Sequence, residues 1–96
     1  MHWAEFKEIF RHYIMTTEGA FTTIDTSMLI HFDLDRFLAR QSTSNKLSIP
    51  QCEMLESLSV VLDRYESIDI SEENMAYIDA LRQRGWLRLS LNNSCR

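Results

Sequence analysis

The clearest fold signal in the sequence lies in residues 48–66, which read SIPQCEMLESLSVVLDRYE. Ser48 suits a helix N-cap, Pro50 is tolerated in a first turn because no backbone N–H is needed there, and Gln51 completes a capping box. Apolar residues then recur at helical spacing on one face: Leu55, Leu58, Leu62 and Tyr65. The pattern predicts an amphipathic helix over residues 49–66.

An aromatic stripe marks the N-terminal segment. Its members recur three or four positions apart, which places them on one helix face: Trp3, Phe6, Phe10 and Tyr13. Gly19 suits the left-handed conformation that ends many helices. We predict a helix over residues 2–17. A stripe of this kind either fills the core or forms a surface for a partner or a second copy of the chain.

Residues 20–41 carry two competing patterns. Ile30, Phe32 and Leu34 alternate with polar residues, which is the two-residue period of a strand. Helical spacing also links Leu34 with Phe37, and the periodic stretch is longer than most strands. We predict a helix over residues 27–41, with a small hairpin at residues 20–34 as the alternative.

The last part of the chain predicts one more helix and a short extended segment. Ser71 can cap a helix, acidic residues follow it in the first turn, and Gly85 can end it. We predict a helix over residues 71–84, with Met75 on its buried side. Residues 86–91 alternate leucine with other residues, which predicts an extended segment.

The composition fits one compact domain. The 96 residues include 45% hydrophobic and 25% charged residues but only two glycines and one proline. Together with the segment patterns, this predicts a single, mainly α domain of four helices over residues 1–96, with a short C-terminal extended segment. The alternative is an α+β fold containing the hairpin at residues 20–34.

The sequence also carries expectations about where the protein works. Two cysteines, Cys52 and Cys95, are too few for a disulfide framework, which favours a reducing compartment. Neither a secretory signal nor an apolar run of about 20 residues is present. We therefore expect a cytoplasmic protein that does not enter membranes.

Chemical motifs are weak. His31, Asp33 and Asp35 are residue types that bind metals. On a helix, however, His31 and Asp35 would share a face and Asp33 would point away from them. Cys52 is expected to be a small buried hydrophobe. The chain also has no glycine-rich phosphate loop. We therefore expect neither a metal or cofactor site nor enzymatic activity.

Charge is unevenly distributed along the chain, whose net charge is −4. Acidic residues dominate between Glu53 and Asp79, whereas residues 82–96 contain arginines and no acid. Segregated charge and surplus aromatic residues favour a small regulatory or adaptor protein that binds another protein, with homodimerisation as a further expectation. The predicted contact residues are Trp3, Phe6, Phe10, Tyr13, Glu56, Asp63 and Glu66.

Residues 47–58, LSIPQCEMLESL, resemble the helix that opens the winged-helix core of MarR-type regulators, and residues 81–87, LRQRGWL, resemble the end of their recognition helix. Residues 34–41 fall where such proteins have a dimerisation helix. The resemblance implies a DNA-binding transcriptional regulator in reduced form, with Arg82, Arg84 and Arg88 touching DNA. The chain departs from that family because one short helix is missing between Gln51 and Gly85. Acidic residues also begin the would-be recognition helix, so protein binding is the preferred reading and nucleic acid the alternative.

Overall fold

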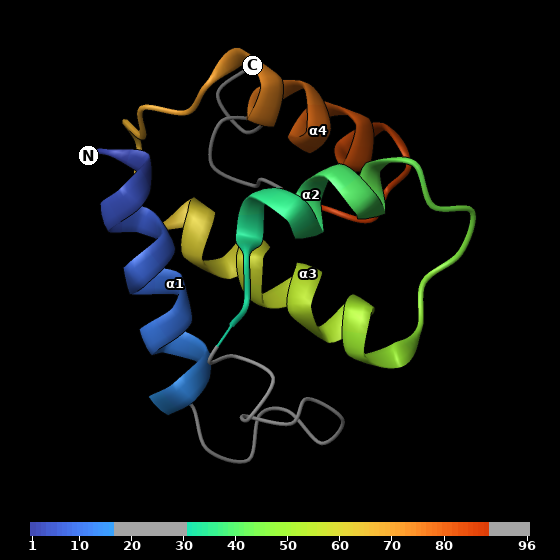
Figure 1. Ribbon diagram of the computed structural model, residues 1–96, viewed down its shortest axis with the longest axis horizontal. Coiled ribbons are helices and arrows are strands. Elements are labelled where there is room, and N and C mark those ends of the chain that lie inside the picture. Colours follow the sequence, from blue (N-terminus) through green and yellow to red (C-terminus); the bar gives the residue numbers. More distant parts are fainter. Residues whose placement is uncertain (17–30, 89–96) are drawn as a thin grey trace.

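The computed structural model describes residues 1–16 and 31–88, and four helices make up most of this part of the chain (Figure 1). They are α1 (Trp3–Thr16), α2 (Leu34–Ser42), α3 (Ile49–Asp63) and α4 (Glu72–Gln83). No sheet forms within residues 1–16 and 31–88. The mainly helical fold predicted from the sequence is therefore confirmed.

The caps of α3 and α4 follow the sequence signals. The Ser48 hydroxyl accepts from the backbone N–H of Gln51 at 3.4 Å, and the Gln51 side chain accepts from the Ser48 N–H at 2.8 Å, so the capping box is present. Ser71 caps α4 by accepting from the N–H of Asn74 at 3.2 Å. Because these side chains satisfy N–H groups that lack helical partners, both predicted starts are correct to within one residue.

The ends of these helices differ more from the prediction. Helix α3 ends at Asp63 with Arg64 as its C-cap, three residues before the predicted end. After α4, Gly85 takes a φ of 78°, the left-handed conformation expected of a glycine stop. Trp86 then donates its N–H to the carbonyl of Leu81 at 3.0 Å, which completes the turn.

The start of α2 corrects the sequence prediction. Residues 31–33 are not helical; Asp33 is extended, with φ −115° and ψ 105°, and its side chain accepts from the N–H of Arg36. The helix therefore begins at Leu34. The Asp33 carboxylate accepts a first-turn N–H, which would bond to a backbone carbonyl if the helix began earlier. Residues 27–30, most of the alternative hairpin and Gly19 lie outside the described residues.

The predicted extended segment at residues 86–91 is only partly described. Trp86 and Leu87 lie in a bend, while residues 89–91 lie outside the described part of the chain. Leu87 is buried, and the neighbouring Arg88 N–H donates to the Ser59 hydroxyl of α3 at 3.1 Å. This segment is therefore held against α3 by one apolar side chain and one backbone hydrogen bond.

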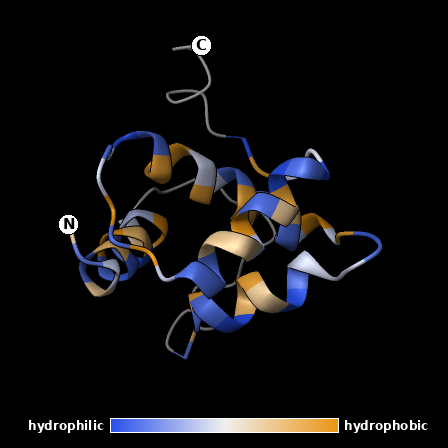
Figure 2. Ribbon diagram, turned by 90° about the horizontal axis from the view of Figure 1, so that it is seen from above, coloured by the Kyte–Doolittle hydropathy of each residue, from blue (hydrophilic) through white to orange (hydrophobic). Residues whose placement is uncertain are grey.

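One hydrophobic core joins the four helices. Helix α1 packs against α3, and α2 packs against α4. Hydropathy alternates along each helix, as the amphipathic patterns require (Figure 2). The core is composed of Phe6, Phe10, Ile14, Leu34, Leu38, Met54, Leu55, Leu58, Val61, Leu62, Ile78, Leu81 and Leu87. Met75, predicted on the buried side of α4, is instead 38% exposed.

A carboxylate on α2 ties that helix to α1 and α4. Asp35 accepts hydrogen bonds from the Trp3 indole at 2.7 Å, the Lys7 ammonium at 2.8 Å and the Asn74 amide at 2.9 Å. Partial burial raises the pKa of Asp35, but the Lys7, Trp3 and Asn74 hydrogen bonds and the Lys7 charge outweigh it, so its pKa is lowered overall. Asp35 therefore fixes the relative position of three helices.

The N-terminal residues are also fixed. The terminal ammonium of Met1 donates to the carbonyl of Ser67 at 2.9 Å, and the Asp69 N–H donates to the carbonyl of Met1 at 2.8 Å. An isolated parallel bridge forms there between His2 and Asp69. The start of α1 is thus held beside the link between α3 and α4 (Figure 1). Among the described helices, none has both the length and the hydrophobicity needed to cross a membrane.

Candidate functional site: a groove between α2 and α3

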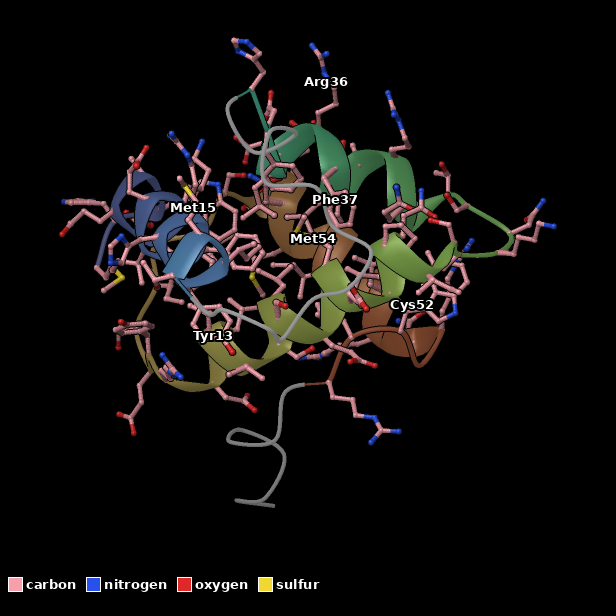
Figure 3. All side chains as sticks on the ribbon, turned by 90° about the horizontal axis from the view of Figure 1, so that it is seen from below. Tyr13, Met15, Arg36, Phe37, Cys52 and Met54 are labelled. Carbon is pink, nitrogen blue, oxygen red and sulfur yellow. The ribbon has the colours of Figure 1, made fainter. Side chains whose placement is uncertain are left out.

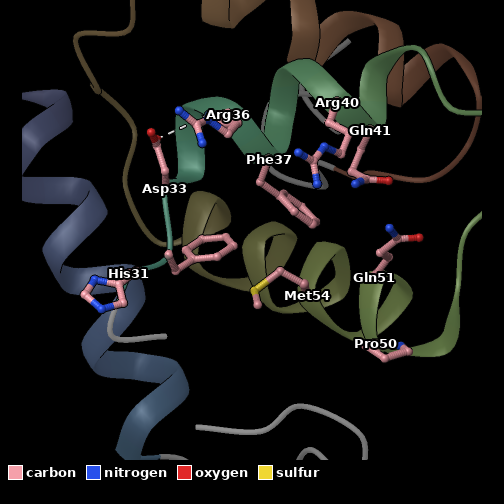
Figure 4. A pocket seen from close by; sticks show the side chains of 10 residues that line it. His31, Asp33, Arg36, Phe37, Arg40, Gln41, Pro50, Gln51 and Met54 are labelled. Carbon is pink, nitrogen blue, oxygen red and sulfur yellow. Dashed lines mark hydrogen bonds between the residues drawn. The ribbon is translucent and has the colours of Figure 1, made fainter. Parts of the chain in front are cut away.

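A groove of about 320 Å³ opens on the described surface where α2 lies across the first turns of α3. Its floor is formed by Phe32, Phe37 and Met54, with the two phenylalanine rings 5.5 Å apart at a tilt of 53°. Phe37 points from α2 toward α3, where Met54 faces it (Figure 4). The groove therefore has an apolar floor built from two helices and the segment before α2.

The rim of the groove is polar and mostly basic. Arg36 and Arg40 border it from α2, His31 borders it at one end, and all three are exposed. Arg36 extends away from the body of the molecule, whereas Phe37 lies inward beside Met54 (Figure 3). Long cationic side chains thus stand at the edge of a partly exposed aromatic pair.

The local sequence of α2 explains this arrangement. Because the helical period is about 3.6 residues, side chains four apart in α2 share a face: Arg36 with Arg40, and Phe37 with Gln41. Leu34 and Leu38 turn instead into the core, where they are 3% and 0% exposed. One short helix therefore supplies part of the core, part of the aromatic floor of the groove and the two arginines of its rim.

The charges of the rim are not balanced within the described part of the chain. Neither the Arg36 nor the Arg40 guanidinium forms an ion pair with any residue that the structure describes. Among the described residues, Asp33 is the only acidic side chain that lines the groove, and it accepts the N–H of Arg36 as the cap of α2. The first turn of α3 carries no acid, so the partial positive charge of that helix start adds to the two guanidinium charges.

A second hollow of about 450 Å³ lies beside the first, between α1 and the start of α2, and shares His31, Phe32 and Asp33 with it. Its charged residues are largely matched. Lys7 pairs with Asp35 at 2.8 Å, and Arg11 lies 3.9 Å from Glu8. Among the described residues, Lys7 and Arg11 of this hollow have acidic partners, although the Arg11 Nε has no hydrogen-bond partner, whereas Arg36 and Arg40 of the groove have no ion-pair partner.

The aromatic stripe of α1, predicted as a partner surface, is divided between the core and the edge of the molecule. Phe6 and Phe10 are 0% and 1% exposed. Trp3 is half-buried, stacks on Phe6 and donates to Asp35. Tyr13 is half-buried, with the Arg64 guanidinium 5.0 Å above its ring. Of the four, only Trp3 and Tyr13 offer surface to a partner in this conformation.

The predicted acidic contact residues lie on or just after α3. Glu56 and Glu66 are exposed, and Asp63 is half-buried. Glu56 shares an outward face of α3 with Ile49, which is 66% exposed, and Val60, which is 43% exposed. Cys52 lies on this face too and is an exposed free thiol, so the prediction that it is buried was wrong. The helical pattern alone does not reveal which of these side chains the other elements leave exposed.

The three arginines of the nucleic-acid alternative have different surroundings. Arg82 pairs with Asp79 at 3.3 Å, and Arg84 donates to the Ser44 carbonyl and lies 5.1 Å from the Trp86 ring centre. Arg88 is exposed. Arg84 thus joins the end of α4 to the loop after α2, and DNA contact by this set stays a prediction.

The cluster of metal-ligand types around His31 is also separated. Asp33 caps α2, Asp35 accepts three hydrogen bonds, and His31 lies in a turn. Within the described residues, no three histidine, cysteine or acidic side chains come together in a way that could hold a metal ion. The two aspartates have structural roles here.

Comparison with known proteins gives no match: the chain matches no family model, no curated protein and no solved structure. Sequence reasoning did not single out the groove residues Arg36, Phe37 and Arg40. The sequence does show two arginines four residues apart on either side of a phenylalanine. That both arginines border one groove is seen only once the start of α2 and its position over α3 are known.

Proposed function

We propose that the protein is a small regulatory or adaptor domain that works by binding another protein, with the α2–α3 groove as its principal contact surface. The observation that carries this proposal is the juxtaposition of a partly exposed aromatic floor with two arginines that lack ion-pair partners in the described structure. Aromatic residues and arginine are the residue types most enriched at the energetic centres of protein interfaces.

The dimensions of the groove support a protein partner over a small molecule. Sites for drug-sized ligands enclose most of the ligand and occupy roughly 300–1,000 Å³. This groove, at about 320 Å³, is at the small end of that range, and its basic residues are exposed. It has room for one or two anchoring side chains of a partner whose remaining surface rests on the rim.

The outward face of α3 supports a second, weaker contact. Ile49 and Val60 are large apolar side chains in solvent, and Glu56 stands between them. We propose this face as the site of homodimerisation, because a small domain gains stability by burying such side chains against a copy of itself. The exposed free thiol of Cys52 supports placement in a reducing compartment such as the cytoplasm.

Site-specific photocrosslinking tests the proposed function. A photoreactive amino acid replaces Arg40 in one variant and Arg88, which is exposed but does not line the groove, in a matched control. Each variant is expressed in cells of the source organism and irradiated. We expect a discrete protein adduct from position 40 that Phe37→Glu in the same chain abolishes. Absence of an adduct at position 40, or the same adducts from both positions, contradicts the proposal.

A further inference from the structure

The spacing of the two groove arginines defines a pattern that a ligand would have to match. Arg36 and Arg40 are four residues apart on α2, so they stand about 6 Å apart along the helix axis at a rise of about 1.5 Å per residue. Both are exposed, and neither has an ion-pair partner among the described residues. Two carboxylates at the same spacing would meet both guanidinium groups.

The floor beside the arginines adds an apolar requirement. Phe32 and Phe37 are half-buried, while Met54 is 7% exposed and closes the bottom of the groove. A matching ligand therefore presents large apolar side chains next to its acidic ones. Asp33 lies between His31 and Arg36 and accepts the Arg36 N–H at 3.3 Å, so its charge stands near Arg36 as well (Figure 4). Among the described lining residues, the two guanidinium groups outnumber this one carboxylate, so the acidic positions of a ligand belong over Arg36 and Arg40.

We infer that the groove binds an acidic amphipathic helix of a partner protein, with two carboxylates one turn apart over Arg36 and Arg40 and apolar side chains packed on the floor of Phe32, Phe37 and Met54. This inference rests on the proposed protein-binding function. A helix fits because carboxylates four residues apart on one face reproduce the spacing of the arginines, and apolar residues at neighbouring positions of that face reach the floor. The complementarity of charge and of apolar surface identifies the class of partner.

Fluorescence anisotropy with designed peptides tests the inference. The probe is a labelled amphipathic helical peptide of about 16 residues, long enough to form helix in part, with leucines on one face and two glutamates four apart beside them. A second peptide has lysines in place of the glutamates. We expect the wild type to bind the glutamate peptide at least about tenfold more tightly, and added salt to weaken that binding.

Charge reversal of the protein provides the decisive comparison. Arg36→Glu combined with Arg40→Glu is expected to reverse the preference, so that the variant binds the lysine peptide more tightly than the glutamate peptide. The matched control combines Arg82→Glu with Arg88→Glu, which changes the net charge equally at residues that do not line the groove. This control is expected to keep the wild-type preference. Equal binding of both peptides, or an equal loss in the control, overturns the inference.

The outcomes separate this inference from the proposed function. If position 40 gives a protein adduct in cells but the wild type shows no preference for the glutamate peptide, the acidic-helix inference fails and the protein-binding function stands. If neither is seen, both fail. If the wild type is a dimer in sedimentation equilibrium and the groove double variant is a monomer, the groove binds a second copy of the chain, which also overturns the inference.

Discussion

Two regions of the molecule concentrate aromatic side chains, and they use them in opposite ways. The stripe on α1 places Phe6 and Phe10 in the core, with 0% and 1% of each side chain exposed. The groove keeps Phe32 and Phe37 only partly buried beside arginines. The difference comes from their neighbours, because α3 packs across the α1 stripe, whereas the groove aromatics line an open hollow. Aromatic density in a sequence therefore does not by itself identify a binding surface.

The largest expected effect comes from truncating one aromatic residue in each region. Phe10→Ala removes a fully buried ring from the core and should lower the free energy of unfolding by about 3–5 kcal/mol. Phe37→Ala removes a partly buried ring and should lower it by about 2 kcal/mol. Urea unfolding followed by circular dichroism measures both values. Equal losses would mean that the groove aromatic is as much a core residue as the α1 stripe.

A smaller effect is expected at the link between the two regions. Asp35, on the groove helix α2, accepts hydrogen bonds from Trp3 and Lys7 on α1. Asp35→Ala should lower the free energy of unfolding by about 1 kcal/mol, a value reduced from that of a buried charged hydrogen bond because the side chain is 39% exposed. Lys7→Met, which keeps the Trp3 and Asn74 hydrogen bonds, is the control and should have a smaller effect.

The same link has a defined dependence on pH. Since the hydrogen bonds from Lys7, Trp3 and Asn74 lower the pKa of Asp35 in the folded protein, its contribution is fully present above the ordinary value of 3.8. That contribution is lost as the pH falls below 3.8 through the lower folded pKa. Unfolding measured from pH 6 to about pH 2 should therefore show a smaller difference between wild type and Asp35→Ala in acid. A constant difference would assign the effect to packing instead.

The comparison of the two regions also shows what the sequence could predict. Local signals carried well: the capping box at Ser48, the Ser71 cap and the Gly85 stop all lie where the pattern places them, because each depends only on nearby backbone groups. The start of α2 was not predicted correctly. The apolar pattern continues on both sides of Asp33, so the sequence did not identify this residue as the cap.

The candidate site was harder to predict because it depends on contacts between distant segments. The groove exists only where α2 lies over Pro50 and Met54 of α3, and sequence periodicity contains no information on that crossing. The same limit explains Cys52, which was expected to be buried within an amphipathic helix but is exposed on the outward face of α3. Which face of a helix is covered is decided by its packing partners.

The smallest expected change in the free energy of unfolding belongs to the groove arginines. This prediction distinguishes a role in binding from the structural role of the aromatic core. Arg36→Glu puts an acid in the first turn of α2, which the helix dipole favours, whereas Arg40→Glu puts one in the last turn, which the dipole disfavours. The two contributions should nearly cancel, so the double variant should unfold within about 0.5 kcal/mol of the wild type in urea. A loss of more than about 2 kcal/mol would show that the arginines hold the fold together. A recognition role instead requires that reversing both charges leaves the fold intact, because only then does a changed peptide preference report on the surface itself.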